Sequence, residues 1–193
     1  MQVIHDFITP NEYSRPGRKL REVLGIVMHW TANPNANAQE NRNFFDSLKA
    51  GMGGYASSHY IVDQNGLIVA AVPEYEIAYH CGSSKPDPAS GVPYTDEARR
   101  RFGHYASSKS SPNYCTIGVE LCPLDAEGNF SGPTISAAVS LCADLCQRYG
   151  LEPEAITTHH DVVGWKDCPL LWTKKPELFD AFKASVGDRM KRG

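Results

Sequence analysis

The 193-residue sequence predicts an α/β protein whose mixed central β-sheet carries helices on both faces. Two observations lead to this fold class. Short apolar runs with the length of buried strands alternate along the chain with segments of helical periodicity, a succession typical of α/β folds. One pair of these runs is separated by Asn65-Gly66, which predicts a tight hairpin and hence an antiparallel pair inside the sheet.

The first half of the chain is expected to supply three strands and one helix. Residues 23–30 have the composition of a buried strand, and the two hairpin strands cover 59–64 and 67–72. Asn37 and Glu40 have the spacing of a helix-capping box. The helix that follows should end at a glycine, Gly51, and its apolar residues at helical spacing are Phe44, Phe45 and Leu48.

Residues 81–113 form the least regular part of the sequence. They are rich in Ser, Pro and Gly, and only residues 95–102 are expected to be helical. An irregular segment of this length inside a compact domain is usually functional or mobile. Two interpretations stay open for it: a wall of a substrate cleft, or a plain surface excursion.

The remaining chain continues the alternation of strands and helices. Strands are expected over 116–121 and 155–158, with a helix over 135–149 between them that has one buried stripe and stops at a glycine. A last helix is expected over 176–187, which leaves residues 188–193 frayed. The residues of this last helix expected to pack inward are Leu178, Phe179, Phe182 and Val186.

Composition excludes several classes of partner. A net charge of -3 and a pI of about 6.1 offer no basic face for nucleic acid. No run approaches the roughly 18 apolar residues of a membrane span, so no membrane insertion is expected. Residues 1–25 lack the pattern of a signal peptide. We therefore expect a chain that is synthesised in the cytoplasm and folds as one domain over 1–193.

The six cysteines are expected to be reduced thiols rather than disulfides, because the sequence carries no secretion signal. Cys142 and Cys146 lie four residues apart on one helical face, a spacing that indicates packing. The CxxC spacing of structural zinc sites is absent from the sequence.

The stretch from His159 to Cys168 combines two imidazoles, an ammonium and a thiol in one short loop. Imidazole and thiolate donors suit zinc best. Another ligand must come from elsewhere, and His29, which ends an apolar run, is the best candidate. On the chemistry of these residues alone, a metal site and ordinary buried side chains remain equal alternatives.

Five ordered motifs resemble those of the zinc-dependent N-acetylmuramoyl-L-alanine amidases of type 2, and most closely the prophage-type amidases that act as endolysins. The likeness extends over about residues 13–169, and its motifs are residues 26–31, 57–63, 76–82, 117–121 and 159–169. This family shares its fold with the peptidoglycan recognition proteins. The resemblance implies a mixed sheet with a ligand groove on one face, and no separate wall-binding module is expected within the chain.

The resemblance also implies a Zn²⁺ ion bound by His29, His159 and Cys168, with a fourth position open for water or substrate. His160 remains an alternative to His159, because a shift of one residue in the family's His-x-Asp pattern would exchange them. Asp161 is expected to orient the loop rather than to bind the metal.

Two catalytic side chains are implied by the same resemblance. Glu120 matches the family's proton shuttle, and Lys166 matches the cation that stabilises the oxyanion. The alternatives are an exposed strand carboxylate and a solvated loop lysine. Trp30 and His80 are expected to flank the groove and bind the sugar or stem peptide, with a purely structural role as the alternative.

The implied activity is hydrolysis of the amide bond between N-acetylmuramic acid and L-alanine in peptidoglycan, in cell-wall lysis after release of the protein. Two alternatives stay open: a non-catalytic peptidoglycan-binding module, and an amidase that acts on soluble muropeptides in wall recycling. GxSxG and HExxH motifs are absent from the sequence, so a serine hydrolase or a metalloprotease has little support.

Overall fold

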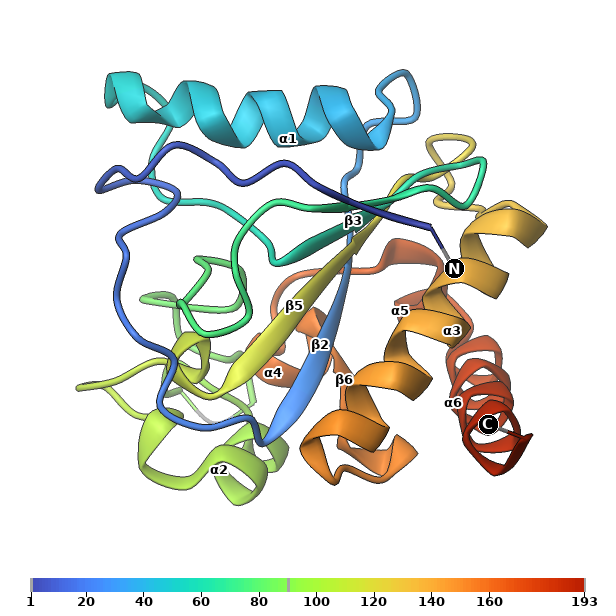
Figure 1. Cartoon of the computed structure of the whole chain (residues 1–193). Helices are drawn as coiled ribbons and strands as arrows, with labels where there is room; N and C mark the ends of the chain where they lie inside the picture. The colour runs from blue at the N-terminus through green and yellow to red at the C-terminus, as the bar shows by residue number, and fades with distance from the viewer. Residues whose placement is uncertain (1, 90, 193) are drawn as a thin grey trace.

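The computed structural model describes residues 2–89 and 91–192 of the chain. Within these residues a six-stranded sheet has the order β1-β4-β3-β5-β2-β6 (Figure 1). β3 and β4 pair antiparallel, and the other neighbours pair parallel, so the predicted mixed sheet is confirmed. The strands are β1 (Val3–His5), β2 (Gly25–Trp30), β3 (Tyr60–Val62), β4 (Ile68–Ala70), β5 (Thr116–Leu121) and β6 (Ile156–Thr158).

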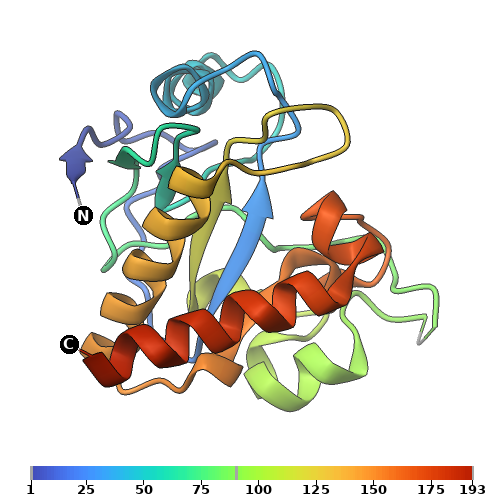
Figure 2. The ribbon, with the colours of Figure 1, turned by 90° about the vertical axis from the view of Figure 1, so that its right-hand side faces the viewer.

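Helices cover both faces of the sheet, as the sequence predicts. α3 and α6 lie together on one face, and Figure 2 shows them in front of the strands. α1, α2 and α4 pack against the opposite face. The helices are α1 (Ala38–Ser47), α2 (Asp96–Phe102), α3 (Gly132–Tyr149), α4 (His159–Val163), α5 (Leu170–Lys174) and α6 (Pro176–Arg192). No helix in the described part of the chain is both long and apolar enough to cross a membrane.

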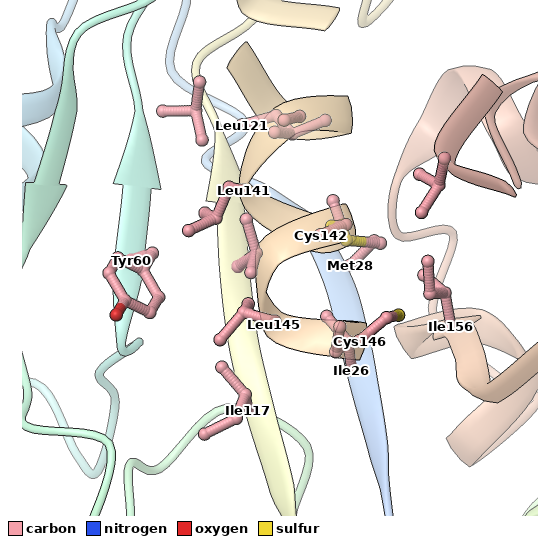
Figure 3. Packing of buried hydrophobic residues seen from close by; sticks show 14 of the residues in the cluster. Ile26, Met28, Tyr60, Ile117, Leu121, Leu141, Cys142, Leu145, Cys146 and Ile156 are labelled. Atoms are coloured by element: carbon pink, nitrogen blue, oxygen red, sulfur yellow. Dashed lines mark hydrogen bonds between the residues drawn. The ribbon is translucent and has the colours of Figure 1, made fainter. Parts of the chain in front are cut away.

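Strand alternation divides the buried side chains between the two faces. Ile26 and Met28 of β2 point toward α3, together with Ile117 and Leu121 of β5 (Figure 3). The intervening Val27 packs with α2 and α4 on the other face. His29, two residues after Val27 on β2, therefore also faces away from α3, into the space between α1 and the α2–α4 pair.

Both cysteines of α3 are buried packing residues, as predicted from their spacing. Cys142 and Cys146 lie in the α3 surface that covers β2, and the Cys142 Sγ is 3.7 Å from the Met28 sulfur (Figure 3). All six cysteines of the chain are buried and free.

The predicted hairpin and helix ends are present, with a different turn geometry in the hairpin. Three residues, rather than two, separate the paired Asp63 and Leu67, and Gly66 takes a φ of +85°. This is the pattern of a three-residue loop with a left-handed glycine. Asn37 and Glu40 form the predicted capping box of α1, and Gly51 follows in the left-handed conformation.

Several expectations were wrong in detail. Leu178, expected to pack inward, is 40% exposed, because the neighbouring Phe179 fills the inward position of its helix. Residues 188–192 continue α6 instead of fraying, while residue 193 lies outside the described range. The stretch from His159 to Cys168 begins as helix α4 rather than as a loop, and β1 and α5 were not predicted.

A partly exposed ion-pair network joins the segment after β4 to the end of α3. Glu74 accepts two hydrogen bonds from Arg148, at 2.6 and 2.8 Å, and further hydrogen bonds from the hydroxyls of Tyr149 and Tyr60. Although burial opposes it, this set of donors lowers the pKa of Glu74 to about 2 from its ordinary 4.5. The network therefore favours folding while Glu74 is ionised.

Replacing Glu74 with Gln should remove an acid-sensitive part of the stability. Because the folded-state pKa lies below the unfolded one, the contribution is complete above pH 4.5 and disappears as the pH falls toward 2. With Arg148 partly exposed to solvent, we expect a contribution of about 1–2 kcal/mol at pH 7. Urea unfolding at pH 7 and pH 3 measures it. The exposed Glu127→Gln is the control, and equal acid sensitivity of Glu74→Gln and the control would contradict the assignment.

Candidate functional site

A cleft of about 470 Å³ opens on the face of the sheet opposite α3 and α6. Its floor is formed where β2, β5 and β6 end, which is where parallel strands gather the side chains of successive segments. The candidate residues from sequence analysis that line it are His29, Trp30, His80, Glu120, His159, Lys166 and Cys168. The structure thus brings together every residue that the sequence singled out for the site.

Strand register explains why these residues meet. β2 lies between β5 and β6, and His29 of β2 is paired with Glu120 of β5. On the other side, Met28 is paired with Thr158, the last residue of β6. The chain then turns into α4 at His159, whose first turn is closed by a capping box between Thr158 and Asp161. His159 is thereby held beside His29, although 130 residues separate them.

Three donor atoms form the centre of the cleft. Nitrogen or sulfur atoms of His29, His159 and Cys168 all lie within 4.8 Å of one another, and all three residues are buried. The Nδ1 atoms of the two histidines are 3.1 Å apart, and the Cys168 Sγ is 3.7 Å from the His29 Nδ1. The His160 backbone N–H donates a hydrogen bond of 2.9 Å to the Cys168 carbonyl oxygen, which holds Cys168 close to the start of α4. These three residues could hold a metal ion.

Burial sets the ionisation of the donors. It lowers the pKa of His29 well below the usual imidazole value, and the neighbouring His159 and His80 lower it further. Burial and then the charge of Lys166 lower the pKa of His159 to about 3. Burial raises the pKa of the Cys168 thiol to about 12. Both imidazoles are therefore neutral near pH 7, the form in which histidine binds metals.

His159 and His160 have different surroundings. His160 is turned away from the other donors, with its Nδ1 3.1 Å from the Lys166 carbonyl oxygen. Asp161 accepts hydrogen bonds from the Thr158 backbone and from the Thr157 hydroxyl, so its carboxylate stabilises the start of α4. The geometry favours His159 as the donor and gives Asp161 an orienting role.

Glu120 and Lys166 face the same cleft. Within the described residues, Oε2 of Glu120 is buried without a hydrogen-bond partner. Burial raises the pKa of this carboxyl to about 7, against the opposing effect of the Lys166 charge. Lys166 itself is an exposed residue of the cleft rim. The pair combines a carboxyl that can exchange a proton near neutral pH with a nearby cation.

Trp30 and His80, predicted to bind substrate, occupy different depths of the cleft. Trp30 is partly exposed, and its ring supports the turn at Gly128, where an added Cβ would lie 3.3 Å from the indole. His80 is buried, and its two ring nitrogens lie within 3.2 Å of His29 and Thr116. Trp30 can meet a ligand through its ring face, whereas both polar atoms of His80 have partners inside the protein.

Sequence reasoning missed an aromatic border of the cleft. Tyr55 and Tyr79 stand edge to face on one side, with ring centroids 5.4 Å apart. Trp165 stands elsewhere on the border and donates its indole N–H to the Ser83 hydroxyl over 3.1 Å. A signal was present for two of them, because Tyr79 directly precedes His80 and Trp165 directly precedes Lys166. Nothing near Tyr55 in the sequence distinguished it.

The irregular segment from 81 to 113 has two structural roles. Its ends line the cleft, with Gly82, Ser83 and Ser84 at one end and Asn113 at the other. Its described middle part forms the predicted helix α2, which buries Phe102 in the core. The cleft wall and the core therefore share this segment, and neither interpretation from the sequence describes it completely.

The residue pattern of a protein family described as N-acetylmuramoyl-L-alanine amidase matches residues 19–170. The chain belongs to this amidase family. The matched range contains all the candidate residues of the cleft, including the three donors, Glu120 and Lys166. Family membership therefore rests on the part of the chain that builds the site.

Individual members of the amidase family match the chain over nearly its whole length. A probable N-acetylmuramoyl-L-alanine amidase of Bacillus licheniformis is 36% identical over 192 residues, which are 100% of this chain and 49% of that protein. The N-acetylmuramoyl-L-alanine amidase BlyA of Bacillus subtilis strain 168 is 34% identical over 96% of this chain and 47% of its own length. The chain thus spans about half the length of these curated relatives.

Solved structures share the fold of this amidase-family chain. The catalytic domain of XlyA superposes with a TM-score of 0.70 at 24% identity, covering 97% of this chain and 100% of that domain. The catalytic domain of PlyG gives a TM-score of 0.71 at 19% identity, covering 98% and 96%. These likenesses confirm the arrangement of sheet and helices.

Replacing Cys168 with Ser should weaken metal binding at the three donors, because an alcohol is a poorer donor than a thiolate. We expect a loss larger than the roughly 10–100-fold that follows from changing an outer partner of a ligand. Competition with a chromophoric chelator measures the affinity. Cys146→Ser, a buried cysteine on the opposite face of the sheet, is the matched control. Equal affinities of the two variants would remove Cys168 from the ligand set.

Proposed function

We propose that the chain is a zinc-dependent amidase that hydrolyses the bond between N-acetylmuramic acid and L-alanine in peptidoglycan. One observation carries the proposal: in a member of this amidase family, the cleft gathers three buried donors, an unpaired carboxyl oxygen and a lysine. Peptidoglycan is then the partner, and the natural setting is lysis of the polymeric wall.

The donor set fits zinc. Tetrahedral coordination with ordinary Zn–N and Zn–S lengths separates two nitrogens by about 3.3 Å and a nitrogen from a sulfur by about 3.6 Å. The corresponding distances are 3.1 Å between the histidines and 3.7 Å from Cys168 to His29. Three protein donors leave one position open, as in catalytic zinc sites. A bound zinc ion supplies a Lewis acid that polarises the amide carbonyl and acidifies water.

Glu120 is the group that would move protons in this reaction. Its unpaired Oε2 can accept a proton from the attacking water and later donate it to the nitrogen of the leaving L-alanine. A carboxyl with a pKa of about 7 is suited to both steps near neutral pH. The burial that raises this pKa also keeps the carboxyl away from bulk water.

Lys166 would stabilise the negative charge that develops on the carbonyl oxygen during attack. Lys166 lies at the rim of the same cleft as Glu120. Its positive charge contributes to lowering the pKa of His29 and of His159. A cation placed in advance at a developing oxyanion needs no reorganisation during the reaction. Trp30 and the aromatic border, with Tyr55 and Tyr79, would bind the sugar and the stem peptide of the substrate.

Replacing Glu120 with Gln should preserve the shape of the cleft and remove the proton shuttle. We expect turnover to fall by about 10²–10⁴-fold, the range typical of a lost general acid–base group. Zinc content after gel filtration should stay unchanged. Glu177→Gln, an exposed glutamate at the start of α6, should retain full activity. Near-normal turnover of Glu120→Gln would contradict the assigned role.

The proposed bond and metal dependence can be tested together by mass spectrometry of purified peptidoglycan. Incubation with the zinc-loaded protein should release stem peptides that begin with L-alanine, and a chelator should abolish the release. A protein that sediments with intact peptidoglycan without cleaving it would instead be a recognition module. Faster turnover of soluble muropeptides than of sacculi would favour wall recycling over lysis.

A further inference from the structure

His80 is fixed in a slot over the centre of the sheet. Its ring lies directly above Gly118 of β5, where an added Cβ would be only 2.6 Å from the His80 Cγ. No side chain other than hydrogen leaves room for the imidazole at that point. Since Gly118 lies two residues before Glu120 on the same strand, it faces the same side of the sheet as the cleft.

The segment that leads into β5 also anchors the backbone of His80. The Asn113 side-chain oxygen accepts hydrogen bonds from the backbone N–H groups of His80 and Cys81, at 3.2 and 2.9 Å. Asn113 is itself buried. The backbone and the ring of His80 are therefore both determined by residues 112–118, so the direction of its nitrogens is fixed.

A chain of hydrogen bonds runs from a backbone carbonyl to the candidate metal ligand. The Thr116 Oγ1 is 2.7 Å from the Pro112 carbonyl oxygen and 3.2 Å from the His80 Nε2. The His80 Nδ1 is in turn 3.1 Å from the His29 Nε2. The remaining nitrogen of His29, Nδ1, faces His159 and Cys168.

The direction of each hydrogen bond in this series follows from the Pro112 carbonyl oxygen at its start. A carbonyl oxygen can only accept, so the Thr116 hydroxyl must donate to Pro112. The Thr116 oxygen is then the acceptor of a hydrogen bond from the His80 Nε2–H. In a neutral imidazole only one nitrogen carries a hydrogen, so the His80 Nδ1 accepts from the His29 Nε2–H. The same rule leaves the His29 Nδ1 without a hydrogen.

Both rings are neutral because they are enclosed in the protein. His29 and His80 are 2% and 8% exposed, and no acidic side chain lies within hydrogen-bond distance of either ring among the described residues. Of the His159 nitrogens, Nδ1 lies 3.1 Å from the His29 Nδ1, and Nε2 is buried without a partner in the described residues. The Nε2 of His29 therefore has a hydrogen-bond partner in the protein, whereas the Nε2 of His159 has none among the described residues.

We propose that Thr116 and His80 form a one-way hydrogen-bond relay that holds His29 in the tautomer with a bare Nδ1, ready to bind the metal. His80 is then a positioning residue, a role different from the substrate contact expected from the sequence. An outer partner of this kind fixes both the tautomer and the orientation of a ligating histidine. The inference rests on the proposed metal site, but the tautomer of His29 can be measured without metal or substrate.

Zinc affinity of two Thr116 variants tests the relay. Thr116→Val keeps the shape of the side chain and removes the hydroxyl, so His80 loses the acceptor that fixes its tautomer. We expect zinc to bind roughly 10–100-fold more weakly to this variant, as for other outer partners. Thr116→Ser retains the hydroxyl and should bind zinc like the unaltered protein. Equal zinc affinity in the Val and Ser variants would overturn the proposal.

Nitrogen-15 NMR of the histidine rings in the unaltered protein provides a test that does not depend on how the variants fold. In the unaltered, metal-free protein, His29 should show a protonated Nε2 and a bare Nδ1, and His80 should show the same tautomer. Thr116→Val should convert both rings to mixtures of tautomers. A protonated Nδ1 on His29 of the unaltered protein would overturn the relay, whatever the protein's activity. Absence of zinc binding together with the expected tautomer would instead contradict the proposed function.

Discussion

The parallel pairing of β2 with both of its neighbours is the constraint on which the site depends. This strand lies between β5 and β6, so residues that are far apart in sequence reach the same end of the sheet. Register then decides the face: His29 and Glu120 are paired and lie on the side away from α3. A shift of one residue in this pairing would turn one of the two side chains into the apolar layer. The apolar core thus specifies the relative placement of the polar groups in the cleft.

One face of the sheet carries the main apolar core, and the other face carries the polar side chains of the cleft. The face under α3 and α6 is filled mainly by aliphatic and sulfur-containing side chains, which need no hydrogen-bond partners, and the Tyr60 hydroxyl on this face is bound to Glu74 (Figure 3). The opposite face accommodates four buried histidines, and burying such groups is unfavourable unless they are paired. His59 is fully paired, with one ring nitrogen toward the Glu76 carbonyl and the other accepting the Gly118 N–H. Among the described residues, buried side-chain atoms without a hydrogen-bond partner occur at Thr31, Glu120 and His159, and the last two lie within the cleft, where a ligand can meet them.

Sequence patterns predicted the elements well wherever one face of an element is buried, because burial leaves a periodic signature. They could not predict β1, whose three residues are mostly exposed and pair with a strand more than 60 positions away. They also did not distinguish Phe44 from Phe45 of α1, of which only Phe45 is buried, and they assigned Leu178 inward beside Phe179. The start of α4 was predictable in principle, since Thr158 and Asp161 have capping-box spacing. The orientation of His80 was not, because it depends on contacts with Gly118 and Thr116 across the sheet.

The separation of the donors along the chain links the cleft to the folding of the whole domain. His29 and His159 are 130 residues apart, and Cys168 lies 139 residues from His29. A metal ion held by them closes a loop that contains most of the sheet, much as a reversible cross-link does. Ligand binding that requires the folded arrangement stabilises that arrangement by mass action. The supply of metal would therefore act on how long the protein survives heat and proteases, as well as on whether its cleft is active.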